Sequence, residues 1–189
     1  MATTPQTRSP AELARDTFEA LFDRRDFAAV RQYWTEESVD HFLALGIDAR
    51  GPQELEAFFR EFLAAVPDFK MTIENIVEDD RHAVVQWTGS GTFNGGPFQG
   101  IEPTGRYVSL RGCDVIRFSA DGKLEENTIY YDGAEFARQI GMLPPRDSAV
   151  DKGMTEVFNT VTRLRGRISN RRGLSAVQAA GPPARPTRP

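Results

Sequence analysis

Apolar residues recur at helical spacing along the first third of the chain. The stripe begins after Ser9, Pro10 and Glu12, which match the capping box that starts a helix. A second, short helix is predicted from Asp26. The clearest helix opens at Gly51, where apolar positions recur every three or four residues up to residue 66. We therefore expect three helices in the first third of the chain.

The segment from Ser38 to Arg50, ahead of the third helix, has no clear period. We predict a loop or lid there, and it carries Asp40 and His41. Histidine titrates near neutrality and a carboxylate can orient it, so His41 is a candidate base. A solvent-facing loop histidine with no chemical role is equally compatible with the pattern.

After Pro67 the period changes from helical to two. Four stretches rich in β-branched and aromatic residues predict strands, at 69–77, 82–93, 107–118 and 123–131, and a short helix follows at 133–140. Glycines at 89, 91 and 112 predict bulges or bends that let the sheet curl. Helices followed by an antiparallel meander indicate an α+β domain in which the helices cover one face of a curved sheet.

The charge distribution separates the end of the chain from its body. Residues 1–150 hold 15 Lys and Arg against 25 Asp and Glu, whereas residues 151–189 hold 8 against 2. We expect a disordered N-terminus at 1–8, one domain at 9–143, a linker and basic amphipathic helix at 144–173, and a disordered tail at 174–189. The helix is expected to dock on the domain or on a second subunit; a membrane surface or an acidic partner is the alternative.

Several functional classes are disfavoured by composition. An acidic body argues against a nucleic-acid surface, and no apolar run approaches the roughly 20 residues of a membrane span. The N-terminus lacks the features of a secretion signal, so we expect a cytoplasmic protein. The single cysteine, Cys113, has no second cysteine to pair with and is expected to be structural. Zinc-ligand spacing, a phosphate-binding glycine loop and a serine nucleophile motif are absent from the sequence.

Four stretches resemble one known family: GPQELEAFFREFLAAVPDF, VVQWTGSGTF, FQGIEPTGRYVSLRGCDVIRF and DGKLEENTIYYDGAEFARQIG. Over residues 10–143 the chain is similar to the SnoaL-like polyketide cyclases, or ester cyclases, of the nuclear-transport-factor-2-like superfamily. The resemblance implies a cone-shaped α+β barrel, in which a curved antiparallel sheet packs against N-terminal helices around an apolar pocket. It also implies a homodimer, a role in secondary metabolism, and chemistry without a metal or organic cofactor.

Only some of the family's site residues are found at the matching positions of this chain. The resemblance places Asp40 and His41, Asp114 and Asp132 at positions that members use near the pocket. Ile129, however, stands where the ring-closing cyclases have their acid/base aspartate. Phe93 likewise replaces a histidine near the end of the second strand. These departures put the family's known aldol chemistry in doubt for this chain.

Period-two alternation gives a separate argument for Asp114. If its side chain points into the pocket, its neighbours two residues away are apolar or glycine, and the arginines at 111 and 117 face outward. A carboxyl in apolar surroundings loses solvation as an anion, so its pKa should rise towards the range useful for acid/base work. Asp114 could instead bond a buried backbone group or an arginine.

Four further positions are candidates for binding the substrate. Tyr131 and Asn127 are candidates for polarising a substrate carbonyl, whereas Trp87 and Phe93 either line the pocket or fill the core. Asp132 either acts in the pocket or caps the helix from Gly133. The candidate catalytic residues are therefore Asp114, His41 and Asp132, and the candidate substrate-binding residues are Asp40, Trp87, Phe93, Asn127, Ile129 and Tyr131.

Three functions remain open at this point. The leading hypothesis is a cofactor-independent cyclase or isomerase that acts on an apolar, carbonyl-bearing or polycyclic small molecule by acid/base catalysis. The first alternative is a non-catalytic small-molecule-binding protein or dimeric interaction module, which Ile129 favours. The second is an enzyme that opens epoxides with the same acids. A fold shared by many chemistries does not choose between them.

Overall fold

A single six-stranded sheet frames the first part of the molecule, in the order β2-β1-β6-β5-β4-β3. The computed structural model describes residues 8–179, with side chains up to residue 166. All neighbouring strands are antiparallel except β1 and β6, which are parallel. The strands are β1 (Val39–Phe42), β2 (Ile47–Arg50), β3 (Lys70–Glu78), β4 (His82–Phe93), β5 (Arg106–Phe118) and β6 (Leu124–Tyr131).

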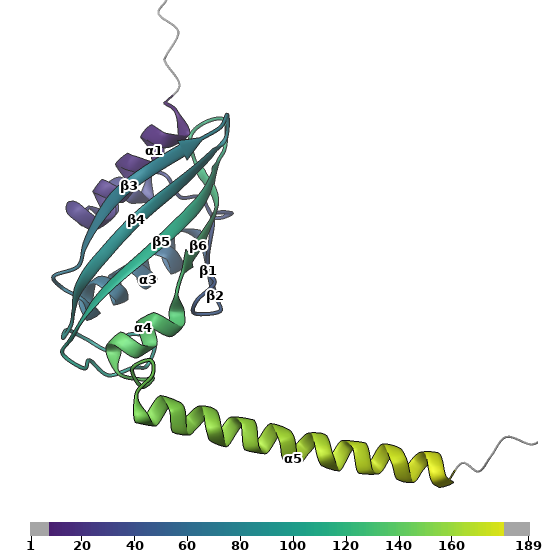
Figure 1. Ribbon diagram of the computed structural model, residues 1–189. Helices are drawn as coiled ribbons and strands as arrows, with labels where there is room; N and C mark the ends of the chain where they lie inside the picture. Colours follow the sequence, from purple (N-terminus) through teal and green to yellow (C-terminus); the bar gives the residue numbers. More distant parts are fainter. Residues whose placement is uncertain (1–7, 180–189) are drawn as a thin grey trace, which may run out of the picture. The chain divides into compact units, whose positions relative to one another are not determined.

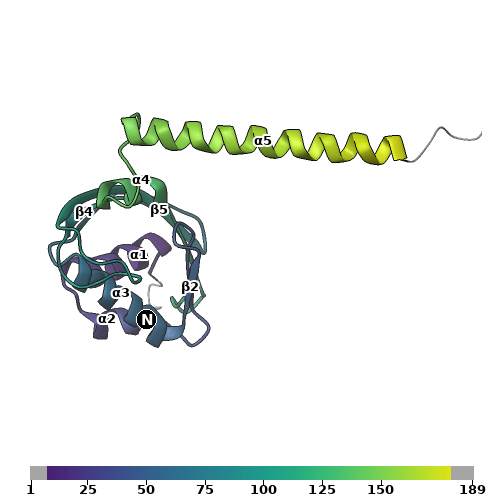
Figure 2. The same ribbon diagram turned by 90° about the horizontal axis from the view of Figure 1, so that it is seen from below.

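The helices before β3 lie on the concave side of this sheet (Figures 1 and 2). Figure 2 shows the strands curving around α1 and α3. These elements are α1 (Pro10–Phe18), the π-helical turn η1 (Glu19–Asp23), α2 (Phe27–Arg31) and α3 (Gly51–Ala65); α4 (Gly133–Ile140) packs on β5. The predicted α+β class, with a curved sheet covered by helices, is confirmed.

The predicted capping box opens the first helix. The Glu12 backbone N–H donates to Ser9 Oγ at 3.3 Å, and the Ser9 N–H donates to the Glu12 carboxylate at 3.0 Å. These bonds satisfy two of the N–H groups that a helix start leaves without intrahelical partners. The N-terminal motif therefore fixes where α1 begins.

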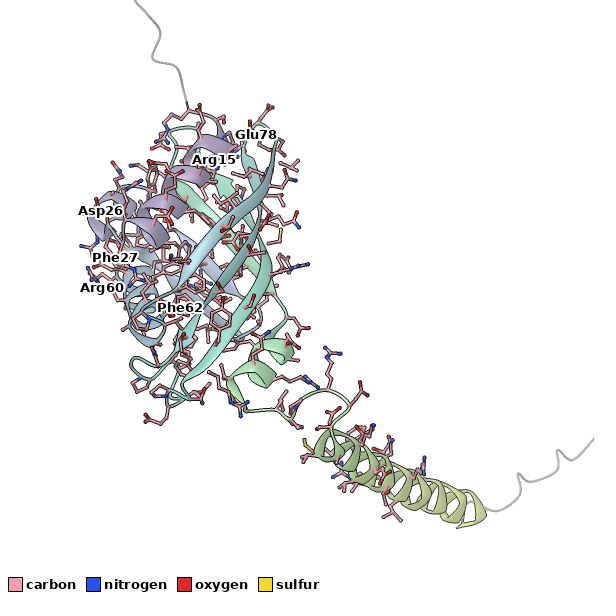
Figure 3. The ribbon with its side chains drawn as sticks, turned by 60° about the vertical axis from the view of Figure 1, so that its left-hand side comes forward. Arg15, Asp26, Phe27, Arg60, Phe62 and Glu78 are labelled. Atoms are coloured by element: carbon pink, nitrogen blue, oxygen red, sulfur yellow. The ribbon has the colours of Figure 1, made fainter. Side chains whose placement is uncertain are left out.

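Aromatic side chains from the helices and the sheet fill the space between them. Phe59 on α3 stacks against Trp34, and Phe42 on β1 stacks on Phe58 with ring centroids 3.8 Å apart. In Figure 3, Phe62 points from α3 towards the sheet, whereas Arg60 lies on the outer side, over the Phe27 ring at 4.1 Å. The inward face of α3 therefore supplies the core with aromatic rings.

The predicted loop at Ser38 to Arg50 is wrong, because β1 and β2 form a hairpin there. β1 alternates between faces, so Asp40 and Phe42 point towards the core while His41 points away. The Ser38 hydroxyl donates to the Leu124 carbonyl at 2.5 Å and so ties the start of the hairpin to β6. A four-residue strand is too short for its period to be clear in the sequence.

The predicted bulges at the strand glycines are also not observed. Gly89, Gly91 and Gly112 stay in regular register, and the irregularities fall at Ile73/Asn75 and Arg117/Phe118. The glycines serve close packing instead, since an added Cβ at each would lie within 3.0 Å of a neighbouring side chain. Their role is to let large residues lie against the strands.

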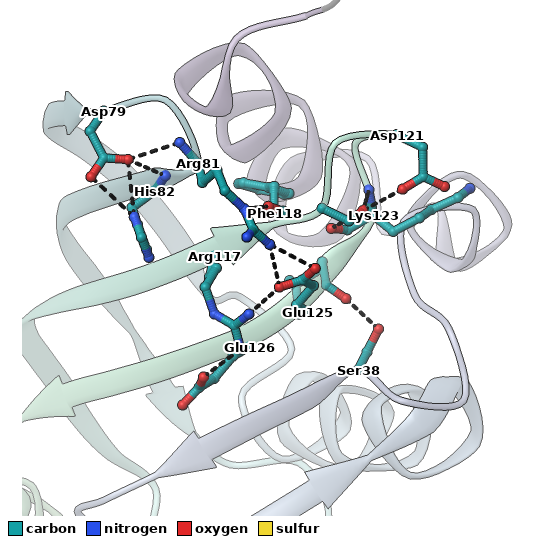
Figure 4. Close-up of polar contacts among 12 residues, drawn as sticks. Ser38, Asp79, Arg81, His82, Arg117, Phe118, Asp121, Lys123, Glu125 and Glu126 are labelled. Carbon is teal, nitrogen blue, oxygen red and sulfur yellow. Dashed lines mark hydrogen bonds and ion pairs between the residues drawn. The ribbon is translucent and has the colours of Figure 1, made fainter.

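The outer face of β4, β5 and β6 carries a charged network at one end (Figure 4). Arg81 and Arg117 both pair with Glu125, and Arg117 also pairs with Glu126 at 2.9 Å. Close by, Asp79 accepts hydrogen bonds from the backbone N–H groups of the β3–β4 turn. These pairs are largely exposed, so they position strand ends more than they stabilise the fold.

A separate unit begins at Pro144, since residue contacts divide the chain after Leu143. It contains the helix α5 (Ala149–Ala179). The helix runs past residue 174, where the sequence predicted a disordered tail; the predicted disorder at residues 1–7 and 180–189 lies outside the described residues. Among the residues that the structure describes, no helix has the length and apolar character needed to cross a membrane.

Candidate active site

An internal cavity of about 100 Å³ lies between the helices and the concave face of the sheet. Its walls are almost entirely aromatic and aliphatic side chains from α1, η1, α3 and the sheet. Polar side chains enter it from the neighbouring strands β1 (Asp40), β5 (Asp114) and β6 (Asn127 and Tyr131), and Thr17 of α1 also lines it. A pocket with apolar walls and a few convergent polar groups is the usual form of a small-molecule site.

Asp114 is the best-supported acid/base residue of this cavity. It is 6% exposed and accepts hydrogen bonds from Trp87 Nε1 at 2.7 Å and from Asn127 Nδ2 at 3.1 Å. Burial raises the pKa of Asp114 to about 6, because the anion loses solvation, while the two hydrogen bonds limit that rise. No arginine pairs with it among the described residues. Asp114 can therefore exchange a proton near neutral pH.

Asp40 brings a second carboxyl to the same cavity. It is 2% exposed and lies beside Asn127 in the parallel register of β1 and β6. Burial raises the pKa of Asp40 well above its usual range; the nearby Asp114 charge adds to the rise, and hydrogen bonding by Asn127 opposes it. Because the charge of Asp114 adds to the rise at Asp40, Asp40 is the carboxyl of the pair that gives up its proton less readily. Two carboxyls with separated pKa values are suited to opposite acid and base roles.

Two buried acceptor atoms near this pair have no hydrogen-bond partner within the described part of the chain. They are Asp40 Oδ1 and Asn127 Oδ1. An unsatisfied buried acceptor costs free energy, so it usually has a proton or a ligand donor to bond in the functional state. A proton on Asp40 turns one of these acceptors into a donor aimed at the cavity lining. The polar end of the cavity can therefore both accept and donate hydrogen bonds to a ligand.

Trp87 reaches Asp114 because Gly112 leaves room for its ring. Trp87 on β4 and Gly112 on β5 are cross-strand partners, and an added Cβ at Gly112 would lie 2.1 Å from the indole ring. The ring lies across the glycine, and its N–H meets the carboxyl two residues farther along β5. This role of Gly112 has no sequence signature, because a strand glycine equally indicates a bulge.

The structure does not bring His41 to the cavity. Its Nδ1 lies 2.7 Å from Asp48 Oδ1 and its Nε2 3.5 Å from Glu126 Oε1, both on the outer face. Residues alternate in β1, so Asp40 inside requires His41 outside. Asp132 also lies outside the cavity lining, where it caps α4 by accepting from the Glu135 N–H at 2.9 Å. The two residues are positioned for structural roles.

The remaining predicted residues divide between cavity and core. Trp87, Asn127, Ile129 and Tyr131 line the cavity, and burial raises the pKa of the Tyr131 hydroxyl to about 12, so it stays protonated. Phe93 is fully buried away from the cavity lining. Trp34, which follows α2 in the chain, is also in the cavity wall. Both tryptophans of the chain therefore face the same cavity.

The family comparison agrees with this architecture. The family model described as SnoaL-like polyketide cyclase matches residues 12–140, which is more than half of the chain. The match covers α1 to α4 and all six strands, and it leaves α5 outside. No curated protein matches the sequence.

Solved structures share the fold at low sequence identity. A proposed SnoaL-like polyketide cyclase from Jannaschia sp. CCS1 has a TM-score of 0.65 and 20% identity, over 76% of this chain and 99% of that one. IdmH from Streptomyces antibioticus, a proposed polyketide cyclase, has 0.60 and 22%, over 71% and 99%. AclR from Streptomyces galilaeus, a proposed hydroxylase, has 0.62 and 21%, over 83% and 98%. The names differ in reaction, so the shared fold does not identify the chemistry.

Proposed function

The chain belongs to the SnoaL-like polyketide cyclase family, and we propose that it is a catalytic member that moves protons on a compact, apolar carbonyl compound. The observation that carries the proposal is the environment of Asp114. Its buried carboxyl faces an aromatic cavity, has a pKa of about 6, and is held by Trp87 and Asn127. A base whose pKa lies just below the working pH is efficient in general base catalysis.

Asp114 takes the proton in the first step. The ionised carboxylate removes a proton from the carbon next to the substrate carbonyl, and the C–H electron pair moves to form an enolate. The Asp40 carboxyl and the Tyr131 hydroxyl are the proposed donors to the enolate oxygen, since both line the cavity and burial raises the pKa of each. Donors placed before the charge develops lower the barrier without reorganisation.

The second step decides between isomerisation and cyclisation. Asp114, now protonated, returns its proton to a different carbon of the enolate in an isomerisation. In a cyclisation, the enolate carbon instead forms a bond to a second carbonyl of the same molecule, and the proton goes to that oxygen. Either course conserves atoms and electrons and restores the ionised Asp114.

Cavity volume limits the substrate. About 100 Å³ is below the roughly 300–1,000 Å³ of pockets that enclose drug-sized ligands. The observed state accommodates a compact molecule, and a polycyclic substrate requires aromatic wall residues to move. Phe58 and Phe98 are in edge contact in that wall, with ring centroids 5.7 Å apart. We therefore favour a carbonyl compound with one or two rings.

Deuterium exchange at the α-carbons of 2-indanone, followed by proton NMR in D₂O, tests the proposed proton transfer. Asp114→Asn keeps the shape and one acceptor oxygen for the Trp87 N–H, and its amide N–H can donate to Asn127 once that amide turns over, but the base is removed, so exchange should slow by about 10²- to 10⁴-fold. Quenching of tryptophan fluorescence, which Trp34 and Trp87 report from the cavity, checks that the variant still binds the ketone.

The matched control is Asp48→Asn, because Asp48 is an exposed carboxylate outside the cavity. Its exchange rate should equal that of the wild type. Equal rates in wild type and Asp114→Asn, with binding retained in both, would overturn the assignment of the base.

A non-catalytic binding protein is the second candidate function, and Ile129 favours it. This side chain lines the cavity where the ring-closing relatives have an acid, and its apolar surface suits a purely apolar ligand. Such a protein would bind 2-indanone without exchanging its protons, in wild type as in Asp114→Asn. Homodimerisation, a role in secondary metabolism and action on an epoxide stay predictions from the family resemblance, and a cytoplasmic location stays a prediction from the sequence.

A further inference from the structure

Helix α5 carries a coiled-coil repeat that the family match does not cover. Five apolar residues recur at alternating steps of four and three: Val150, Met154, Val157, Val161 and Leu164. The same spacing continues in the sequence at Ile168. Such a repeat keeps all its members on one side of the helix when two helices wind around each other. We call the line of these six residues the seam. A helix that lies singly on a globular domain needs only a broader stripe with period 3.6.

The seam is exposed in the described structure. The exposed fractions are 64% for Val150, 53% for Met154, 66% for Val157 and 51% for Leu164, with 70% for the adjacent Phe158. A contiguous apolar stripe of this kind marks an interaction surface. Gly153 and Gly166 also lower the intrinsic helix propensity of α5. Packing against a partner would supply the stabilisation that the helix needs.

Charge is segregated along the same helix. Its beginning carries Asp151 and Glu156, directly after Asp147, with only Lys152 of opposite sign. From residue 163 to residue 172 the sequence holds arginines at 163, 165, 167, 171 and 172 and no acid. Two copies placed in parallel would bring the basic halves together. Two antiparallel copies would set each basic half beside the acidic end of the other, which lowers the electrostatic free energy.

We propose that α5 pairs with the α5 helix of a second copy of this chain as an antiparallel coiled coil. The seam is self-complementary in that direction, because its five described members and Ile168 are spaced symmetrically about residue 159. Met154 then lies opposite the partner's Leu164, and Val157 lies opposite the partner's Val161. The inference uses only residues outside the cavity, so it holds or fails independently of the proposed function.

Cysteine cross-linking of the full chain tests both the pairing and its direction. In a Cys113→Ser background, the double variant Met154→Cys, Leu164→Cys should form interchain disulfides under mild oxidation, seen as dimers on non-reducing gels. Each single variant should form almost none, because in the antiparallel pair equal positions lie about 15 Å apart along the axis. The two cysteines of one chain are separated by the same distance, so they cannot pair with each other.

A charged residue in the seam provides the matched comparison. Val157→Glu, added to the double-cysteine chain, should reduce the cross-linked fraction at least about tenfold, since it places a carboxylate in the apolar seam. Asn159→Glu, on the opposite side of the same helix, should leave the fraction unchanged. Circular dichroism of each variant verifies that the helical content is retained.

Three outcomes would overturn the proposal. Cross-linking of the single Leu164→Cys variant would show a parallel pair. Absence of any cross-link, with the chain sedimenting instead with phosphatidylserine vesicles, would assign the seam to a membrane surface. Absence of both cross-linking and vesicle binding would show that the seam has another occupant, such as the chain's own first unit.

Discussion

Asp114 on β5 and Ile129 on β6 are cross-strand partners and both face the cavity. The position where the family resemblance implies an acid in ring-closing members is apolar here, and a carboxyl stands directly across from it on the neighbouring strand. Adjacent strands lie about 4.8 Å apart, so the carboxyl remains at the same end of the cavity. In the proposed function, Asp114 supplies the acid/base group from β5, directly across from Ile129.

Replacing Trp87 by Phe should raise the pKa of Asp114 above 6. The indole N–H stabilises the anion by a 2.7 Å hydrogen bond, and phenylalanine keeps the apolar ring without the donor. We expect the pH at which kcat/KM for exchange of the ketone α-protons falls on the acid side, the acid limb of the profile, to rise by up to about one unit. Trp34→Phe, which changes the cavity wall but not the partners of Asp114, should leave the limb in place. If the acid limb of Trp87→Phe lies at the same pH as that of the wild type, the hydrogen bond from Trp87 does not set the pKa of Asp114.

Asp40→Asn should remove the alkaline limb of the same profile. Asp40 acts in its protonated form, and its pKa lies well above the usual range, so wild-type activity should fall when that proton is lost at high pH. Asparagine supplies an amide N–H that is a weaker donor than the carboxylic acid and does not titrate, so kcat/KM should fall by about 10- to 100-fold and stay level at alkaline pH. A persisting alkaline limb would assign it to Tyr131, and Tyr131→Phe distinguishes the two.

Asp114 should also make stability depend on pH. Its pKa is about 6 in the folded protein against 3.8 in the unfolded chain, so the folded state holds the extra proton between these values. This contribution to stability is present below pH 3.8 and is lost as pH rises through about 6. Relative to wild type, Asp114→Asn should gain about 2 kcal/mol in free energy of unfolding between pH 4 and pH 7. Urea unfolding of both proteins across this range measures the difference, and a constant difference would contradict the raised pKa.

Gly112→Ala should displace the Trp87 ring. The added Cβ would lie 2.1 Å from an indole carbon, so the ring must move and its N–H leaves Asp114. We expect a loss of about 1–3 kcal/mol in stability, together with the same shift of the acid limb to higher pH that is expected for Trp87→Phe. Gly96→Ala is the control, because a Cβ there meets nothing within 4 Å. Equal thermal stability of the two variants would rule out this role of Gly112.

Much of the fold could be predicted because its long elements carry clear periods. The capping box at Ser9, the stripe of α3, and the alternation of β4 and β5 each depend on neighbours in sequence. The same alternation is compatible with the inward-facing Asp114 that the family resemblance implies. It could not separate a loop from the short strands β1 and β2, and so it left Asp40 and His41 on a lid. Four residues are too few to show a period.

The candidate site depends on distances between strands, which local pattern does not contain. β1 pairs in parallel with β6, more than 80 residues away, and this pairing brings Asp40 beside Asn127 and turns His41 outward. The sequence by itself determined the long elements and the apolar spacing along α5, because these follow from backbone periodicity. Only the tertiary structure decided that Asp40 joins Asp114, that Trp87 bonds it across Gly112, and that the cavity is small. Those relationships arise where residues remote in sequence compete for one buried space.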